Sequence, residues 1–422
     1  MLLGLFALLP LIAASPKIRL WDAVRLAVGI APFSAVLGFV TPMLVDRWSR
    51  GDPGRAGSAY AINIIGCILG PLLAGFVLLP VLSERWVLFA LALPWLVIGG
   101  NLARAGAKGK QLAFGFLALA LLIFGKDYES RFHHPEVRRD ATATVIATGT
   151  GMRKQLLVNG FGITFLTPAT KMMAHLPLAS LDHPPRNALV ICFGMGTTFR
   201  SLLSWNIRVT AIELVPSVPR LFWYFHSDGP DLLRSPLADV VIDDGRRYLE
   251  RASDQYDVIT IDPPPPVEAA GSSLLYTKEF YSTLKSRLRE GGILQQWLPR
   301  GDEVDQAAVA RALQESFPYL RLFWENPQTR WGTHFLVSMR PLRRWTAAQL
   351  AAHTPPAAAR DLVEWGPQAD AEHQFATLLA NETLLDQMTA EAPDVPALKD
   401  DKPVNEYYLA RRRILPALKR HF

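Results

Sequence analysis

The stretch NALVICFGMGTTFR, residues 187–200, decides the fold that we predict for the C-terminal two-thirds of this chain. Its first part, Asn187–Phe193, is a continuous apolar run, which is typical of a central parallel strand buried on both faces. Gly194 and Gly196 follow at the end of this run, and Thr197–Arg200 then open a predicted helix. Glycines at a strand-to-helix turn let the backbone approach a ligand closely. The pattern therefore predicts a Rossmann-like α/β domain that binds a nucleoside.

A second predicted strand, residues 208–212, ends in Glu213, which lies 17 positions beyond Gly196 (213 − 196). Rossmann domains carry an acidic residue at about this distance from the glycine turn. A carboxylate suits this position because it can accept hydrogen bonds from two ribose hydroxyls at once. We therefore predict that Glu213 binds a ribose.

Two further predicted strands also end in acidic residues. Residues 238–242 lead into Asp244 and Gly245, and residues 256–261 lead into Asp262. In open α/β sheets, ligands bind beyond the carboxyl ends of the strands. These acids and the two glycines are therefore predicted to face one crevice. The alternative for any single acid is that it caps the helix that follows it.

The first 126 residues are almost all apolar, with charges confined to short clusters. Leu26–Val45 and Ala56–Ser83 carry no charge, and each is long enough to cross a bilayer core of about 30 Å. Gly66 and Gly70 lie on one helix face of the second run and would let a neighbouring helix approach closely. Three shorter apolar runs are further candidates: Met1–Ala14, Trp86–Ala103 and Gln111–Gly125. The sequence predicts a transmembrane helical region of about four to five spans.

The charge pattern supports a membrane protein and not a nucleic-acid-binding one. The formal net charge is +6, but no dense basic stripe interleaved with aromatic residues is present in the sequence. Basic residues flank the apolar runs instead: Arg47, Arg50, Arg55, Arg104, Lys108 and Lys110. The two cysteines, Cys67 and Cys192, both fall in predicted apolar elements, which argues against a disulfide framework and fits a reducing compartment. The histidines show no metal-ligand spacing, so we expect no metal.

The stretch from Ala141 to Arg340 resembles spermidine synthases, the polyamine aminopropyltransferases, which are relatives of class I methyltransferases. The segments that carry the resemblance are Met173–Leu178, the glycine motif, Glu213 with Pro216, Asp244-Gly245, Tyr256–Ile259 leading to Asp262, Leu275–Tyr281 and Gly291–Leu294. The N-terminal region is similar to the membrane-fused type of these proteins in Tyr60-Ala61-x-Asn63, and the C-terminal region in Asp400–Pro403. The resemblance implies a class I methyltransferase/spermidine synthase fold.

The resemblance also implies roles for individual residues, with S-adenosylmethionine or its decarboxylated form as the co-substrate and an amine as the acceptor. It assigns Gly194, Gly196 and Gly245 to the nucleoside, Glu213 to its ribose, Asp244 to the adenine amino group, Asp262 to catalysis and Tyr276 to the substrate. A carboxylate at position 262 would help to deprotonate and orient the attacking amine.

The acceptor side departs from the family pattern. The second acid expected after Asp262 is replaced by Pro265, within the run Pro263–Pro266. Ala169 and Thr170 stand where the family has a Tyr-Gln pair that contacts the amine. An unpaired buried ammonium group carries a large desolvation cost, which argues against putrescine as the acceptor. Asp262 followed by prolines is also similar to the Asp/Asn-Pro-Pro-aromatic motif of amino-group methyltransferases, and a stiff loop with no catalytic task is a further alternative.

These patterns predict four segments and leave two functions open. We expect a transmembrane region over residues 1–126, a small β-hairpin section over 137–180 with a turn at Asn159-Gly160, a Rossmann-like domain over 181–340 and a helical extension over 341–422. Three tryptophans are candidates for the acceptor side or for the core: Trp297, Trp324 and Trp331. We predict a multi-pass protein of the inner membrane whose soluble domain faces the cytoplasm, where such nucleosides are made; a homodimer is possible. The function predicted is alkylation of an amine, by aminopropyl or methyl transfer, with a non-catalytic nucleoside sensor as the alternative.

Overall fold

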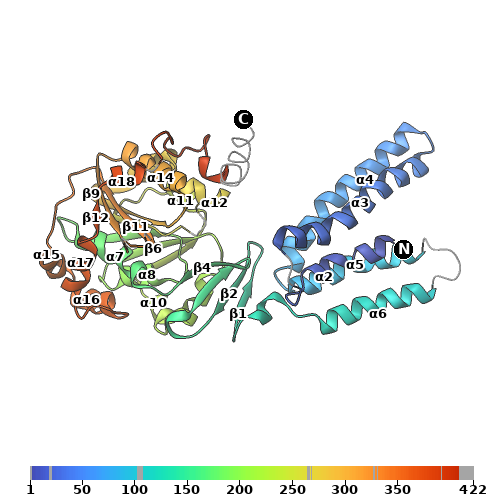
Figure 1. Cartoon of the computed structure of the whole chain (residues 1–422), viewed down its shortest axis with the longest axis horizontal. Helices are drawn as coiled ribbons and strands as arrows, with labels where there is room; N and C mark the ends of the chain where they lie inside the picture. Colours follow the sequence, from blue (N-terminus) through green and yellow to red (C-terminus); the bar gives the residue numbers. More distant parts are fainter. Residues whose placement is uncertain are drawn as a thin grey trace. The chain divides into compact units, whose positions relative to one another are not determined.

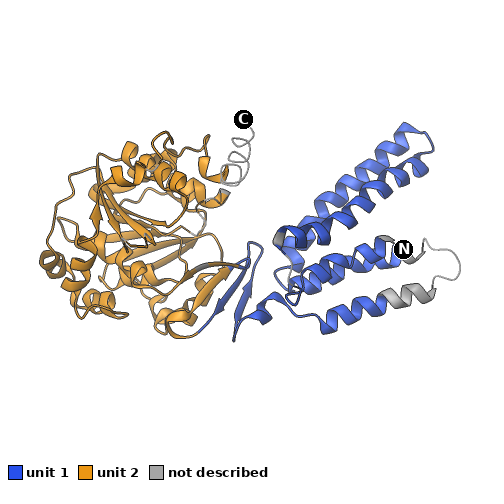
Figure 2. Ribbon diagram, in the orientation of Figure 1, with its two compact units in different colours: residues 1–149, 158–160 blue, residues 150–157, 161–422 orange. Residues whose placement is uncertain are grey.

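The computed structural model describes residues 2–18, 21–101, 108–263, 267, 269–326, 328–329, 331–390 and 392–407. The chain divides into two compact units (Figure 2). The first unit comprises residues 1–149 and 158–160, and the second comprises residues 150–157 and 161–422.

Helices make up most of the first unit (Figure 1). They are α1 (Leu2–Phe6), α2 (Leu9–Ala13), α3 (Asp22–Ser49), α4 (Pro53–Leu73), α5 (Glu84–Asn101) and α6 (Lys108–Phe124). After Pro71, α4 continues into a π-helical turn, Ala74–Leu78. Such turns occur as local irregularities within α-helices.

α3 and α4 are long apolar helices with exposed surfaces. Among the described residues, Ala23–Ser49 and Pro53–Leu78 are the two helices that are long and apolar enough to cross a bilayer. Only 6% of the apolar window of the first and none of the second is buried within the protein. Two shorter apolar helices, Leu3–Ala13 and Gly115–Phe124, are also found in the described part. Two of the four to five predicted spans therefore coincide with helices of the required length, and the number of spans stays a prediction.

The turn between α3 and α4 follows from its sequence. Arg50 and Gly51 both have positive φ, 49° and 85°, which ends α3. Asp52 then caps α4 by accepting hydrogen bonds from the backbone N–H groups of Gly54 and Arg55 at 2.7 and 3.2 Å. A side-chain oxygen at this position satisfies donors that have no partner within the helix. Pro53 fits the first helical position because it has no N–H to satisfy.

A small set of antiparallel strands follows the helices. In the first unit, β1 (Glu136–Arg139) pairs antiparallel with β2 (Thr144–Thr148). β3 (Gln155–Val158) and β4 (Phe161–Phe165) are neighbours in the small sheet. They are joined at Asn159 and Gly160, whose φ angles of 50° and 82° fit the two-residue hairpin turn that the sequence predicted.

The second unit is built on an eight-stranded mixed sheet in the order β12-β10-β11-β9-β8-β5-β6-β7. Its strands are β5 (Asn187–Ile191), β6 (Arg208–Glu213), β7 (Ala238–Ile242), β8 (Tyr256–Ile261), β9 (Leu288–Pro299), β10 (Tyr319–Trp324), β11 (Gly332–Ser338) and β12 (Glu382–Thr383). β7, β6, β5, β8 and β9 are parallel, whereas β11 is antiparallel to both β9 and β10. The predicted Rossmann-like fold is therefore present, with an antiparallel strand inserted near one edge.

The helices of this unit lie between and after the strands. They are α7 (Pro168–Ala179), α8 (Thr197–Leu203), α9 (Phe222–Phe225), α10 (Gly229–Leu232), α11 (Gly245–Arg251), α12 (Ala270–Ser273), α13 (Lys278–Lys285) and α14 (Glu303–Ser316). The predicted C-terminal helical extension contains α15 (Ala347–His353), α16 (Pro356–Val363), α17 (Ala371–Leu379) and α18 (Leu385–Thr389). It also supplies β12, which pairs with β10 at the edge of the sheet.

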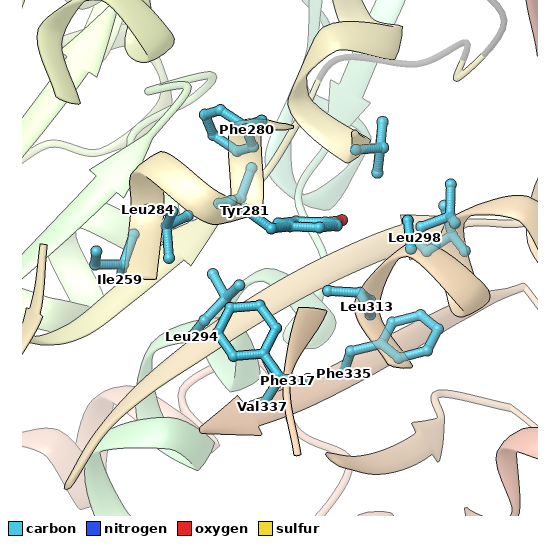
Figure 3. Packing of buried hydrophobic residues seen from close by; sticks show 14 of the residues in the cluster. Ile259, Phe280, Tyr281, Leu284, Leu294, Leu298, Leu313, Phe317, Phe335 and Val337 are labelled. Carbon is cyan, nitrogen blue, oxygen red and sulfur yellow. The ribbon is translucent and has the colours of Figure 1, made fainter. Parts of the chain in front are cut away.

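A hydrophobic cluster covers one face of this sheet (Figure 3). Phe280, Tyr281 and Leu284 of α13 and Leu313 of α14 are fully buried in it. The strand residues beside them are Ile259, Leu294, Leu298, Phe335 and Val337. The cluster holds β8, β9 and β11 against the helices. It therefore fixes the positions of the carboxyl ends of β8 and β9.

Candidate active site

The strand order reverses at β5, because β6 and β7 lie on one side of it and β8 and β9 on the other. Ligands bind in open α/β sheets at such a switch point, beyond the carboxyl ends of the strands. The residues that follow β5, β6, β7 and β8 therefore define the candidate site.

The glycine turn after β5 requires an unusual backbone. Cys192, Gly194 and Gly196 all have positive φ, at 73°, 54° and 79°. This region is readily open to glycine and is uncommon for cysteine. Gly196 is the residue that precedes α8, and its N–H donates to the Phe193 carbonyl at 2.8 Å.

The two predicted glycines differ in their surroundings. A Cβ atom at Gly196 would lie 2.3 Å from Phe222 and 2.8 Å from Phe193, so packing against these rings requires glycine. A Cβ atom at Gly194 would have Thr164 as its nearest neighbour, at 3.9 Å. Gly194 thus leaves space for a ligand, whereas the α-carbon of Gly196 is covered by aromatic side chains. The nucleoside contacts of both residues remain predictions.

Glu213 is held at the end of β6 by backbone donors of the glycine turn. Its Oε2 accepts from the N–H of Phe193 at 3.0 Å, and its Oε1 accepts from the N–H of Val215 at 2.9 Å. Only 8% of the residue is exposed, and burial raises the pKa of its carboxyl, although the backbone hydrogen bonds oppose this shift. The predicted hydrogen bonds from ribose hydroxyls would have to share these oxygens with the backbone donors, and ribose binding by Glu213 stays a prediction.

The acids after β7 have structural tasks that the sequence only partly indicated. Asp244 caps α11, because its Oδ1 accepts from the Arg247 N–H at 2.9 Å. The capping alternative therefore applies to Asp244, and the predicted adenine contact remains a prediction. Asp243 is buried and forms ion pairs with Arg247 and Arg251, and its hydrogen bond from Arg247 lowers the pKa of its carboxyl. Gly245 lets α11 approach β5, since a Cβ atom there would lie 2.6 Å from Ile191.

Asp262 lies directly after β8, beside the end of β5. Its backbone N–H donates to the Ile191 carbonyl at 3.1 Å. Burial raises the pKa of its carboxyl to about 7. An acid–base group is most effective when its pKa lies near the working pH, so Asp262 is suited to accept a proton.

Cys192 is a site residue that sequence reasoning did not assign. It lies between the ends of β6 and β8, since its N–H donates to the Ile212 carbonyl at 2.9 Å. Burial raises the pKa of its thiol well above the usual value, and the charges of Glu213, Asp262 and Asp244 raise it further. The charges of these three acids thus act on one side chain, while their convergence on one ligand crevice stays a prediction.

The predicted substrate residue, Tyr276, is fully buried within the hydrophobic cluster that packs against α13. Its role in substrate binding remains a prediction. Three residues of the run after Asp262 lie outside the described residues: Pro264, Pro265 and Pro266.

The three tryptophans separate into two groups. Trp324 belongs to the core cluster on the α13 side of the sheet. Trp297 packs instead with Ala169 and Met173 of α7, and half-buried Trp331 packs against it with ring centroids 5.6 Å apart. Trp297 and Trp331 thus form a pair next to the Ala169-Thr170 segment that sequence analysis placed at the acceptor.

A buried ion network ties the C-terminal extension to the helices beside the site. Asp361 of α16 accepts from Lys171 Nζ at 2.8 Å and from His175 Nε2 at 2.8 Å, both on α7. It also accepts from Arg200 Nη1 and from Ser201 Oγ of α8, each at 2.5 Å. Lys171 and His175 are fully buried, and the side chain of Asp361 is 7% exposed.

The network fixes the tautomer of His175. The indole N–H of Trp205 donates to His175 Nδ1 at 2.9 Å, so Nδ1 carries no proton and Nε2 carries the one donated to Asp361. Burial lowers the pKa of His175, which favours the neutral ring, although the contact with Asp361 opposes this shift. Sequence analysis could not find this network, because Lys171 and Asp361 lie 190 positions apart.

Comparison with known protein families matches residues 167–324 to the spermine/spermidine synthase domain. Residues 167–324 are therefore similar to that domain. A polyamine aminopropyltransferase of Bacillus subtilis is 33% identical over 165 residues, which are 38% of this chain and 58% of that protein. Polyamine aminopropyltransferase 2 of Pseudomonas aeruginosa is 36% identical over 149 residues, which are 33% of this chain and 42% of that protein. The matches span about half of the length of these curated relatives.

Among solved structures, the spermidine synthase from Thermotoga maritima is similar with a TM-score of 0.46 and 19% sequence identity. That similarity covers 59% of this chain and 84% of the Thermotoga chain.

Proposed function

We propose that residues 167–324 act as a spermine/spermidine synthase domain that alkylates an amine, with decarboxylated S-adenosylmethionine as the aminopropyl donor. The observation that carries this proposal is Asp262, a carboxyl with a pKa of about 7 at the end of β8, beside the glycine turn. The relatives named polyamine aminopropyltransferase support aminopropyl transfer over methyl transfer.

The residues of the site divide the work between binding and proton transfer. Glu213 would accept hydrogen bonds from the ribose. The open space at Gly194 would let the nucleoside approach the protein backbone there. When the donor is bound, its sulfonium makes the adjacent carbon electrophilic. The neutral amine forms a bond to that carbon, the carbon–sulfur bond breaks, and the thioether leaves with the electron pair. Asp262 takes the proton that the alkylated amine releases, and its ionised form is the competent one.

The test uses the full chain in detergent. Calorimetry would measure affinity for decarboxylated S-adenosylmethionine and for S-adenosylmethionine, and mass spectrometry would measure thioether release. Asp262→Asn should lower turnover about 100-fold or more, as expected for loss of a general base, with nucleoside affinity retained. Asp254→Asn is the matched control, because Asp254 is exposed and precedes β8 at its opposite end. If neither nucleoside binds, the proposal fails. If a nucleoside binds and Asp262→Asn leaves turnover unchanged, Asp262 is not the base. Binding without any turnover in the unaltered chain would favour the alternative function, a non-catalytic nucleoside sensor.

We also infer that α3 and α4 lie in a lipid bilayer and that the second unit faces the cytoplasm, where the nucleoside is made. Support comes from the length of these helices and from large exposed apolar side chains such as Phe39 and Ile62, which are 74% and 70% exposed. Ile65→Lys, near the middle of Pro53–Leu78, should oppose insertion by about 3 kcal/mol. Ser58→Lys, near the start of the same helix, should have little effect. Carbonate extraction of membranes would show more soluble Ile65→Lys protein; equal extraction of both variants would contradict the inference.

A further inference from the structure

The register of β8 and β9 brings Trp297 near the end of β8, which Asp262 follows directly. Thr260 pairs with Gln295 and Ile261, the last residue of β8, pairs with Gln296, the residue before Trp297. Neighbouring strands lie about 5 Å apart. Thr260 donates to the Met173 carbonyl of α7 at 3.0 Å, and Trp297 packs on the same helix. Strand alternation continued by one residue beyond Ile261 would direct Asp262 to this face as well.

Aromatic rings from three elements meet on this face. Trp331, just before β11, lies 5.6 Å from Trp297 and 5.7 Å from Phe165 of β4, measured between ring centroids. Trp297 is 8% exposed, whereas Phe165 is 47% exposed. We call Trp297, Trp331 and Phe165 the aromatic wall. It runs from the buried ring near the end of β8 to an exposed ring.

The wall is held rigidly at its inner end. A Cβ atom on Gly332 would lie 2.1 Å from the Trp297 ring, so this ring packs directly on the backbone of β11. The His334 ring also contacts the Trp297 ring, with centroids 4.7 Å apart. His334 is itself fixed by Gln295 at 3.2 Å and by Glu325 at 3.0 Å. A preorganised ring loses little freedom when a ligand binds on it.

The sequence beside the wall offers a second ammonium group no new carboxylate. Ala169 and Thr170 are uncharged, and Pro265 replaces the second acid expected after Asp262. Glu325, the carboxylate in the network that holds the wall, is hydrogen-bonded to His334 at 3.0 Å. Ala169 packs in the same cluster as Trp297, so an apolar contact occupies this side. A cation that is buried without a carboxylate carries a large desolvation cost, whereas an aromatic or aliphatic body gains from burial on the wall.

We propose that the acceptor is a primary monoamine with an aromatic or bulky apolar body, whose nitrogen lies at Asp262 and whose body stacks on the aromatic wall. This inference rests on the proposed alkylation of an amine and specifies its acceptor. Trp331 and Phe165 are specificity-determining residues in this arrangement, and Asp262 keeps its role as the base.

The experiment compares 2-phenylethylamine, hexylamine and 1,4-diaminobutane as acceptors for the full chain in detergent, with thioether release as the readout. We expect kcat/KM to be at least about 10-fold higher for 2-phenylethylamine than for 1,4-diaminobutane, the difference that aromatic contact and burial would give. Trp331→Ala should raise the KM for 2-phenylethylamine about 10-fold or more, with kcat nearly unchanged, because it removes contact and not proton transfer. Trp331→Phe should restore most of the lost affinity.

Trp223→Ala is the matched control, since Trp223 is 44% exposed and lies on α9. Nucleoside affinity measured by calorimetry must be equal in all variants, which shows that each one is folded. Preference for 1,4-diaminobutane, or a KM for 2-phenylethylamine that Trp331→Ala does not change, would overturn the inference while the proposed alkylation stands. Absence of nucleoside binding would instead remove the proposed function itself.

Discussion

Asp361→Asn is expected to destabilise the second unit strongly, because it removes one buried charge from a network of four donors. Lys171 and Arg200 approach Oδ1, and His175 and Ser201 approach Oδ2, at distances between 2.5 and 2.8 Å. Asparagine has the same shape but presents an NH₂ group to one of these two pairs of donors.

Neither orientation of the asparagine amide satisfies its neighbours. Facing Lys171 and Arg200, the NH₂ group would meet two cations. Facing His175 and Ser201, it could donate to the serine hydroxyl but would oppose the histidine Nε2–H. His175 cannot exchange its tautomer without losing the hydrogen bond from Trp205. Breaking a buried ion pair by removing one partner costs about 3–5 kcal/mol, and we expect a loss in this range.

Glu364→Gln provides the matched control. Glu364 contacts Lys171 and Arg200, each at 2.7 Å, but its side chain is 41% exposed. Solvent can replace its contacts, so the expected loss is about 1 kcal/mol or less. The assay is urea unfolding of the full chain in detergent, with hydrogen exchange in α7, α8 and α16 to localise the effect. Equal losses for Asp361→Asn and Glu364→Gln, or a loss below about 1 kcal/mol for the former, would refute the argument from burial.

Further predictions follow from the same geometry. Gly196→Ala should lower the free energy of unfolding by about 2–4 kcal/mol, since it adds a clash with Phe222 to the cost of positive φ. Gly194→Ala should lower it by about 1 kcal/mol and should instead weaken nucleoside binding, measured by calorimetry. A larger loss of stability for Gly194→Ala than for Gly196→Ala would contradict the packing assignment. The rate of thioether release should rise with pH through about 7, because ionised Asp262 is the base and burial raises its pKa to about 7. About 0.1 of this acid is then ionised at pH 6 and about 0.9 at pH 8, so a rate that does not change between these pH values would argue against Asp262 as the base. Burial lowers the pKa of His226 to about 4, whereas its pKa in the unfolded chain is about 6.5. The free energy of unfolding should therefore decrease as the pH falls from about 6.5 towards 4, and His226→Gln should reduce this dependence in urea unfolding. An unchanged pH dependence in the variant would count against a buried neutral ring.

The strands around the site were predictable because their signals are local. The predicted strands at 238–242 and 256–261 coincide with β7 and β8, and those at 187–193 and 208–212 differ from β5 and β6 by at most two residues at one end. A strand buried on both faces is a short apolar run, and a glycine or an acid marks its end. The helical N-terminal unit was predictable for the same reason, since length and apolar composition are properties of one segment.

Contacts across the sheet and between distant segments were not predictable from these signals. The packing of Phe222 and Phe193 against Gly196 was not predictable, whereas the ligand contact assigned to Gly196 stays a prediction. The burial of Tyr276 in the core was not predictable either, and its assignment to the substrate also stays a prediction. Trp297 and Trp324 lie on opposite faces of the sheet, because their partners on β11 are the adjacent residues His334 and Thr333.

The glycine turn at residues 187–200 thus determined by its own sequence that an α/β domain would form, because strand burial and positive φ depend on neighbouring residues. Tertiary structure decided how the surroundings of the two glycines differ, which acids act on the Cys192 thiol and which aromatic residues pack together on the α7 face of the sheet. The reason is physical: strand order, register and the burial of a charge are set by segments that meet only after the chain has folded.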